Sequence, residues 1–294
     1  VFLCSMADAS EDNPSEQELS RLLIAVGTYE GVLAGWKFAD DELKIVFASP
    51  THQGSVRALT FAKSHQLVSA GYDETVRIHD FEKRQTSVGQ VQTTETPVGV
   101  SACGPHHVLV ALTGSLVLYK RRDWSMLHVL RGHEGGTTAL AVHPSAKLAL
   151  SAGNDGKLKL WDLVKGRLAY ASKVDKTHAI DCIVWNSDGS AFAFCYGSHL
   201  TVRDVASGSD LLDVELPSKV HQVCFLKDES QGLFVAAGCD DASLPILLVP
   251  KDDQSEERHA IMAIEPVDGP VAGEERYKCI QAVHGYQVAT ATSA

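Results

Sequence analysis

The feature that most constrains the fold is a repeat that is complete once, between residues 131 and 174. After Gly132-His133 come short alternating strands, separated in turn by His143-Pro144, by Asn154-Asp155-Gly156 and by the segment that follows Trp161-Asp162. Four short strands joined by tight turns make a small antiparallel sheet that cannot bury both of its faces alone. Such a sheet is stable when it is stacked radially against others of its kind. The repeat therefore predicts one blade of a β-propeller.

Weaker copies of this repeat recur along most of the chain, at intervals of about 40–45 residues. We predict an all-β chain whose propeller spans residues 19–294, preceded by a disordered acidic leader over residues 1–18. The seventh blade position supplies two strands and stops at Ala294, so we expect a chain truncated at its C-terminus. We also expect the ring to be open there, and the first blade to lack an inner strand. The predicted blades are approximately residues 19–50, 51–95, 96–131, 132–175, 176–218, 219–269 and 270–294.

Composition narrows the class of partner. The 26 basic residues against 37 acidic ones give a net charge of −11, which disfavours direct nucleic-acid binding through a broad basic surface. The seven cysteines show no paired spacing typical of metal ligands, which favours reduced packing residues of an intracellular protein. No apolar run is long enough to span a membrane. The composition is therefore typical of an ordinary globular protein, and it favours protein partners over nucleic acid.

The complete blade resembles the WD40 repeat. In that family a His, a Ser or Thr, an Asp and a Trp form a hydrogen-bonded network that ties the outer loops to the inner strands. The resemblance implies the same network for His133, Ser151, Asp155 and Trp161. Because buried polar groups need hydrogen-bond partners, we interpret these four residues as structural rather than catalytic.

Three segments go beyond the general repeat: LLIAVGTYEGVLAGWKF (22–38), SAGYDETVRIHD (69–80) and HPSAKLALSAGNDGKLKLWDLVKGRLA (143–169). They resemble the p21-activated protein kinase-interacting protein 1-like family, whose members are nucleolar WD40 factors. The resemblance implies a scaffold in ribosome biogenesis, for large-subunit precursor maturation and rRNA processing, located in the nucleolus or nucleus. It implies pre-ribosomal assembly factors as partners. In some members it also implies inhibitory binding to a p21-activated kinase. The lysine-rich C-terminal tail of the family has no counterpart in this sequence.

Motifs for catalysis were sought and none was found. The sequence has neither a phosphate-binding P-loop nor a Gly-x-Ser-x-Gly nucleophile elbow, and no carboxylate pair is singled out for acid–base work. His106-His107 lacks further metal ligands at a suitable spacing, which favours a turn. We predict a protein that is not an enzyme, with no catalytic, cofactor-binding or metal-binding residue.

The remaining candidates are positions on one propeller face. In a WD40 blade, the loop before the first strand and the turn between the second and third strands reach the same face. Arg57 and Tyr72 form an arginine–aromatic pair of the kind enriched in binding hot spots, and we expect both to be exposed. Matching the repeats predicts six partner-binding residues: Arg57, Tyr72, Asn154, Asp181, His221 and Asp240.

Two alternatives to the ribosomal scaffold remain in view. One is a signalling adaptor that binds and inhibits a p21-activated kinase. The other is a substrate receptor of a cullin-type ubiquitin ligase. Such receptors carry Trp-Asp-x-Arg after the third strand, whereas Val164 stands at the arginine position here, which disfavours that class.

Overall fold

The structure is a computed structural model, and it describes the chain in eleven stretches. Every regular element within them is a β-strand. The described residues are 2–6, 23–39, 42–63, 66–80, 85–174, 178–228, 232–241, 243–250, 261–264, 276–284 and 287–293.

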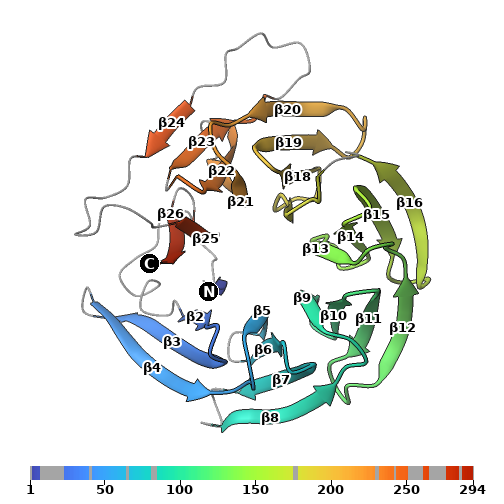
Figure 1. Ribbon diagram of the computed structural model, residues 1–294, viewed down its shortest axis with the longest axis vertical. Coiled ribbons are helices and arrows are strands. Elements are labelled where there is room, and N and C mark those ends of the chain that lie inside the picture. Colours follow the sequence, from blue (N-terminus) through green and yellow to red (C-terminus); the bar gives the residue numbers. More distant parts are fainter. Residues whose placement is uncertain are drawn as a thin grey trace.

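The strands form seven antiparallel sheets arranged around a centre, as Figure 1 shows. The first three sheets contain, in order, β1 (Phe2–Met6), β2 (Leu23–Gly27), β3 (Val32–Ala39) and β4 (Glu42–Pro50); β5 (Val56–Lys63), β6 (Gln66–Gly71), β7 (Thr75–Asp80) and β8 (Gln85–Gln92); and β9 (Pro97–Cys103), β10 (His107–Leu112), β11 (Ser115–Lys120) and β12 (Met126–Arg131).

The fourth to sixth sheets repeat this order, and the seventh is a two-stranded ribbon. Their strands are β13 (Thr137–Val142), β14 (Leu148–Gly153), β15 (Lys157–Asp162) and β16 (Arg167–Lys173); β17 (Cys182–Trp185), β18 (Ala191–Tyr196), β19 (His199–Asp204) and β20 (Asp210–Glu215); β21 (Val220–Asp228), β22 (Gly232–Cys239), β23 (Leu244–Leu248) and β24 (Ile261–Ile264); and β25 (Arg276–His284) and β26 (Gln287–Ser293).

The position of a strand in its sheet explains its composition. The second strands β6, β10 and β14 are buried along almost their whole length, because neighbouring sheets cover both of their faces. They accordingly read as continuous runs of small and β-branched residues rather than as alternating ones. The outermost strand β16 is exposed at nearly every position. Burial therefore falls from the inner part of each sheet to the rim.

The hydrophobic core is divided among the spaces between adjacent sheets. Val68 and Val76 of the second sheet pack with Val108 and Val110 of the third. Similar clusters join the third sheet to the fourth, the fourth to the fifth and the fifth to the sixth. No single sheet could bury these side chains alone, so radial stacking supplies the hydrophobic stabilisation.

The innermost strands form a continuous circle of contacts. Each of β1, β5, β9, β13, β17, β21 and β25 contacts the next, and β25 also contacts β1. The expectation of an open ring is therefore wrong at the inner strands. The molecule is a β-propeller with seven blade positions, of which the seventh contributes two strands among the described residues.

The N-terminal residues also differ from the sequence prediction. Residues 2–6, which the sequence places in a disordered leader, form β1, and Cys4 lies opposite Ala25 of β2 in an antiparallel pair. β1 is thus the inner strand that the first blade was expected to lack. The rest of the predicted leader, residues 7–18, lies outside the described residues.

Candidate functional site

The structure brings together the four residues of the fourth blade that the resemblance grouped. His133 Nδ1 lies 3.1 Å from Asp155 Oδ1, and His133 Nε2 lies 2.7 Å from Ser151 Oγ. Trp161 Nε1–H donates to the same Ser151 hydroxyl at 2.8 Å. All four side chains are almost wholly removed from solvent. Their geometry leaves no open position for a substrate, so the network holds a turn and a connecting loop against the sheet.

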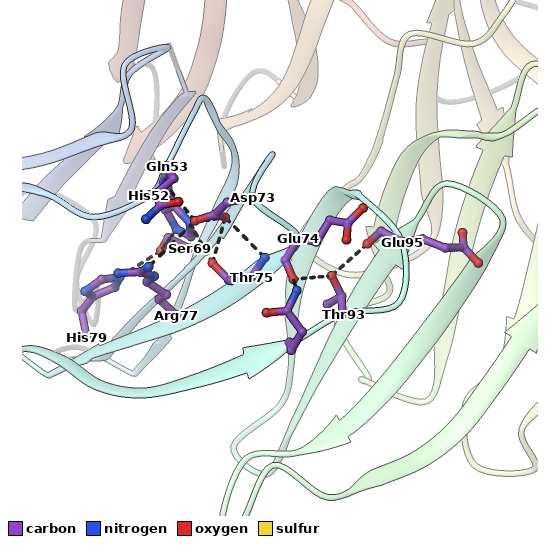
Figure 2. Close-up of polar contacts among 11 residues, drawn as sticks. His52, Gln53, Ser69, Asp73, Glu74, Thr75, Arg77, His79, Thr93 and Glu95 are labelled. Carbon is purple, nitrogen blue, oxygen red and sulfur yellow. Dashed lines mark hydrogen bonds and ion pairs between the residues drawn. The ribbon is translucent and has the colours of Figure 1, made fainter.

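The second blade contains the same network with one exchange, which the sequence reasoning missed. Figure 2 shows His52 between Asp73 and Ser69, with His79 on the other side of the serine. His79 Nε2 lies 2.9 Å from Ser69 Oγ, so a buried histidine replaces the indole of Trp161. The signal was available, because Ser69 and Asp73 precede His79 by the same spacings as Ser151 and Asp155 precede Trp161.

Burial sets the protonation of these networks. It lowers the pKa of His52 and His133 below the ordinary 6.5, although the nearby carboxylates act in the opposite direction. Burial alone would raise the pKa of Asp73. Hydrogen bonds from the Gln53 N–H, His52 and Thr75 outweigh it and hold that pKa below 3.8. Asp155 behaves in the same way. Neutral imidazole paired with ionised carboxylate is the stable state of both networks near neutral pH.

One face of the propeller carries the turns between second and third strands together with the connections that enter each first strand. Backbone hydrogen bonds join the two: the amide of Tyr72 donates to Ser55 O, that of Asn154 to Gly136 O, and that of Asp240 to Lys219 O. We call this surface the turn face; its described segments are residues 28–31, 51–55, 72–74, 93–96, 113–114, 132–136, 153–156, 178–181, 196–198, 216–219 and 240–241.

A β-bulge recurs where the inner strands reach the turn face. In β5, Val56 pairs with Gly71 and Ala58 with Ala70, so Arg57 is an extra residue between them. The register shifts in the same way in β9, β13, β21 and β25, where the extra residues are Val98, Thr138, His221 and Lys278. A bulge re-aims its side chain out of the ladder, and bulges are enriched beside functional sites. The repeated bulges place one residue outside the strict alternation in each of these five inner strands.

Asp181 occupies the equivalent place in the fifth blade, between the buried Ile180 and the first residue of β17. Its carboxylate forms an ion pair with Lys219 Nζ at 3.1 Å, and this contact links the fifth blade to the sixth. In the sixth blade the bulge residue meets the turn residue directly, since His221 Nε2 lies 2.6 Å from Asp240 Oδ1. The predicted residues of blades five and six thus form a connected charged group on the turn face.

The remaining predicted residues lie on the same face with different exposure. Tyr72 is 62% exposed, and Asn154 is exposed while its Nδ2–H donates to Gly135 O at 2.6 Å. Arg57 is only half-buried rather than exposed, which corrects the expectation. Its Nε–H is buried, and no described residue accepts a hydrogen bond from it. The Thr138 hydroxyl, two blades away, is also buried and has no partner among the described residues.

A further turn residue was overlooked. Tyr29 precedes Glu30 and the left-handed Gly31, just as Tyr72 precedes Asp73 and the left-handed Glu74. It is 76% exposed, more than Tyr72. The similarity of GTYEGV to GYDETV was the signal that could have identified it.

Other chemistry is limited in the part of the chain that the structure describes. No group of three or more His, Cys, Asp or Glu side chains there could hold a metal ion, and no helix there could span a membrane. A cavity of about 310 Å³ opens between the fourth and fifth sheets, lined by Leu158, Tyr170, Trp185, Phe192 and Arg203 among others. None of the six predicted partner-binding residues lines it.

Comparison with known families identifies the repeat. The family described as "WD domain, G-beta repeat" matches residues 43–80 and 124–162. Each match begins in or just before the outermost strand of one sheet and continues through the first three strands of the next. The sequence repeat is therefore offset by one strand from the structural blade.

Three relatives indicate the wider similarity. A Danio rerio protein named "p21-activated protein kinase-interacting protein 1-like" is 28% identical over 76% of this chain and 60% of its own length. "Shk1 kinase-binding protein 15" of Schizosaccharomyces pombe is 34% identical over 50% of this chain and 45% of its own length. "Ribosome biogenesis protein WDR12 homolog" of Chlamydomonas reinhardtii is 24% identical over 82% of this chain and 51% of its own length. The chain spans 60% or less of each of these relatives.

Proposed function

We propose that this chain, a WD40-repeat β-propeller, is a non-enzymatic protein-interaction scaffold acting in the maturation of large ribosomal subunit precursors. Pre-ribosomal assembly factors would be its partners, rRNA processing the affected process, and the nucleolus or nucleus its location. The ribosomal part of this proposal is supported by the resemblance of three sequence segments to a nucleolar family and by the relative named for ribosome biogenesis.

The observation that carries the binding role is the construction of the turn face. Bulge positions and turn positions recur from blade to blade. The bulge residues differ in size and charge, as Arg57, Val98, Thr138 and His221 show. Tyr72 lies exposed among them, and Arg57 Nε and Thr138 Oγ1 have no partner among the described residues. Polar groups that lack a partner and an exposed aromatic side chain on one face support a surface that a partner completes.

A second candidate function rests on the names of the relatives. One is named for interaction with a p21-activated kinase and another for binding the Shk1 kinase. We therefore keep, as the alternative, a signalling adaptor whose turn face binds and inhibits such a kinase.

Affinity purification from cells followed by gradient sedimentation tests the proposal. Wild-type protein should sediment with large-subunit precursors. Tyr72→Ala combined with Asn154→Ala should weaken that recovery while leaving the melting temperature nearly unchanged, since both side chains are exposed. Loss of a central interface tyrosine costs about 2 kcal/mol or more of binding free energy. Tyr170→Ala is the matched control, because Tyr170 is 64% exposed but lies on the outermost strand of its sheet.

The outcomes separate the candidates. Recovery of a p21-activated kinase without pre-ribosomal particles would replace the ribosomal role by the adaptor role. Equal recovery with wild-type and turn-face variants would place the binding site elsewhere on the propeller. A variant that also carries Arg57→Ala tests whether the half-buried arginine contributes to binding. The melting temperature of this variant must be measured as well, because part of the Arg57 side chain is packed.

A further inference from the structure

Over the first and second sheets, the turn face carries two exposed tyrosines, one on each of these adjacent blades. Tyr29 and Tyr72 are 76% and 62% exposed, and each stands at the first position of the same kind of turn. Large exposed aromatic side chains are enriched in binding hot spots, and neighbouring ones mark an interaction site rather than scattered surface residues.

The two turns form one continuous surface. The amide of Val56 donates to Thr28 O and that of Tyr72 to Ser55 O, so the connection over residues 51–55 joins them. Gly54 of this connection lies near Gly31 of the first turn and near Tyr72. A Cβ on Gly31 would lie 2.6 Å from Gly54 O, and a Cβ on Gly54 would lie 3.6 Å from Tyr72 Cβ. Gly31 is enclosed by backbone, because a Cβ there would also overlap His52 O. The connection that carries Gly54 therefore packs against the turn of Tyr29 and lies close to Tyr72.

Two exposed carboxylates accompany the tyrosines in these turns. Glu30 follows Tyr29, Glu74 lies two residues after Tyr72, and both are exposed. Glu74 has a φ of 59°, whereas Gly31 and Gly156 occupy the corresponding left-handed positions of the first and fourth blades. Its carbonyl is held in place by Thr93 N–H and Thr93 Oγ1–H, each at 2.8 Å (Figure 2). The turn thus carries a carboxylate at a position where glycine would be unstrained.

We propose that Tyr29, Glu30, Tyr72 and Glu74 form a docking surface for an arginine-containing basic segment of a partner protein. The tyrosine rings offer faces on which a planar guanidinium stacks, and the glutamates supply the opposite charge. The net charge of −11 on the whole chain steers such a segment and repels nucleic acid. This inference rests on the proposed function, since it names the chemistry of the partner at the same face.

Fluorescence anisotropy with labelled synthetic peptides tests it on the purified full chain. The probes are a short peptide in which arginine alternates with glycine and serine, and the same peptide with lysine or glutamate in place of arginine. The arginine peptide should bind more tightly than the lysine peptide, the glutamate peptide should not bind, and added salt should weaken binding. Tyr29→Ala and Tyr72→Ala should each weaken the arginine peptide by roughly two- to fivefold, whereas Tyr170→Ala should not.

Two substitutions of Glu74 separate binding from folding. Glu74→Gln removes the charge and keeps the strained backbone, so it should weaken the peptide without raising the melting temperature. Glu74→Gly should weaken the peptide and raise the melting temperature. Equal affinity of wild-type protein for the arginine and glutamate peptides would overturn the inference, and so would tyrosine variants that bind like Tyr170→Ala. Because these measurements use no cellular partner, their failure leaves the recovery of pre-ribosomal particles as an independent result.

Discussion

Asp155 is the residue on which the turn of the fourth blade most depends. Its carboxylate accepts from His133 Nδ1–H and from the Lys157 amide, with only 7% of the side chain exposed. Asp155→Ala should therefore leave a buried imidazole N–H without an acceptor and lower the free energy of unfolding by about 1–3 kcal/mol. Urea unfolding measures it. Asp123→Ala is the control, because Asp123 also accepts from its own turn but is exposed. An equal loss in both variants would contradict a special role for the network.

The buried histidines His52 and His133 should make stability depend on pH. Their pKa values are lowered by burial, so below 6.5 the unfolded chain binds more protons than the folded one. The free energy of unfolding should fall as pH decreases from 6.5 toward the folded-state pKa values. Below 3.8 the lowered pKa values of Asp73 and Asp155 add a further loss. Melting temperatures across this range measure the effect. His133→Gln should reduce the slope below pH 6.5; a flat wild-type profile would refute the assignment.

Among the sheets, the seventh should be the least protected. β25 and β26 form a two-stranded ribbon in which each strand has a single hydrogen-bonded neighbour among the described strands, whereas β14 and β15 lie inside a four-stranded sheet. Two-stranded hairpins are marginally stable unless they are packed against other elements. Amide hydrogen exchange should therefore be faster in β25 and β26 than in β14 and β15. Equal protection would mean that contacts with β1 and β21 stabilise the ribbon as well as a full sheet does.

The strands of the complete blade could be read from the sequence because its turns are chemically explicit. Gly156 has a φ of 64°, a left-handed conformation that the sequence Asn-Asp-Gly predicts. The segments on either side of this turn have the apolar or alternating patterns that are typical of strands, and they form β14 and β15. The bulges could not be read. In β5, VRALTFAK looks like one regular strand, and the extra residue at Arg57 exists only relative to its partner β6. For the same reason the partial burial of Arg57 was missed.

The pairing of β1 escaped sequence analysis for a different reason. FLCSM is short and is separated from β2 by an acidic segment, so no sequence pattern near it indicates that it pairs with β2 and completes the first sheet. His79 was missed because the hydrogen-bonded network was predicted only for the complete fourth blade. A hydrogen-bond donor of suitable size was the physical requirement at the tryptophan position, and imidazole meets it.

For the molecule as a whole, closure of the inner circle depends on β1. It pairs with β2 and contacts both β5 and β25, so it fills the position between the first and last blades. Removing residues 1–6 should expose the edge of β2 and lower the melting temperature and the resistance to protease. A deletion of equal size over residues 8–13, which removes no described residue, is the control. If both deletions have the same effect, β1 does not close the ring.

The repeated bulge also bears on how such a chain can change over generations. A side chain at Arg57, Thr138 or His221 stands outside the alternation that packs its sheet. If the turn face binds the partner, as proposed, mutations there would alter recognition while the hydrophobic alternation of the strand stays intact. Selection for folding and selection for a partner would then act on different codons of the same strand, and a lineage could exchange partners blade by blade without first losing the fold.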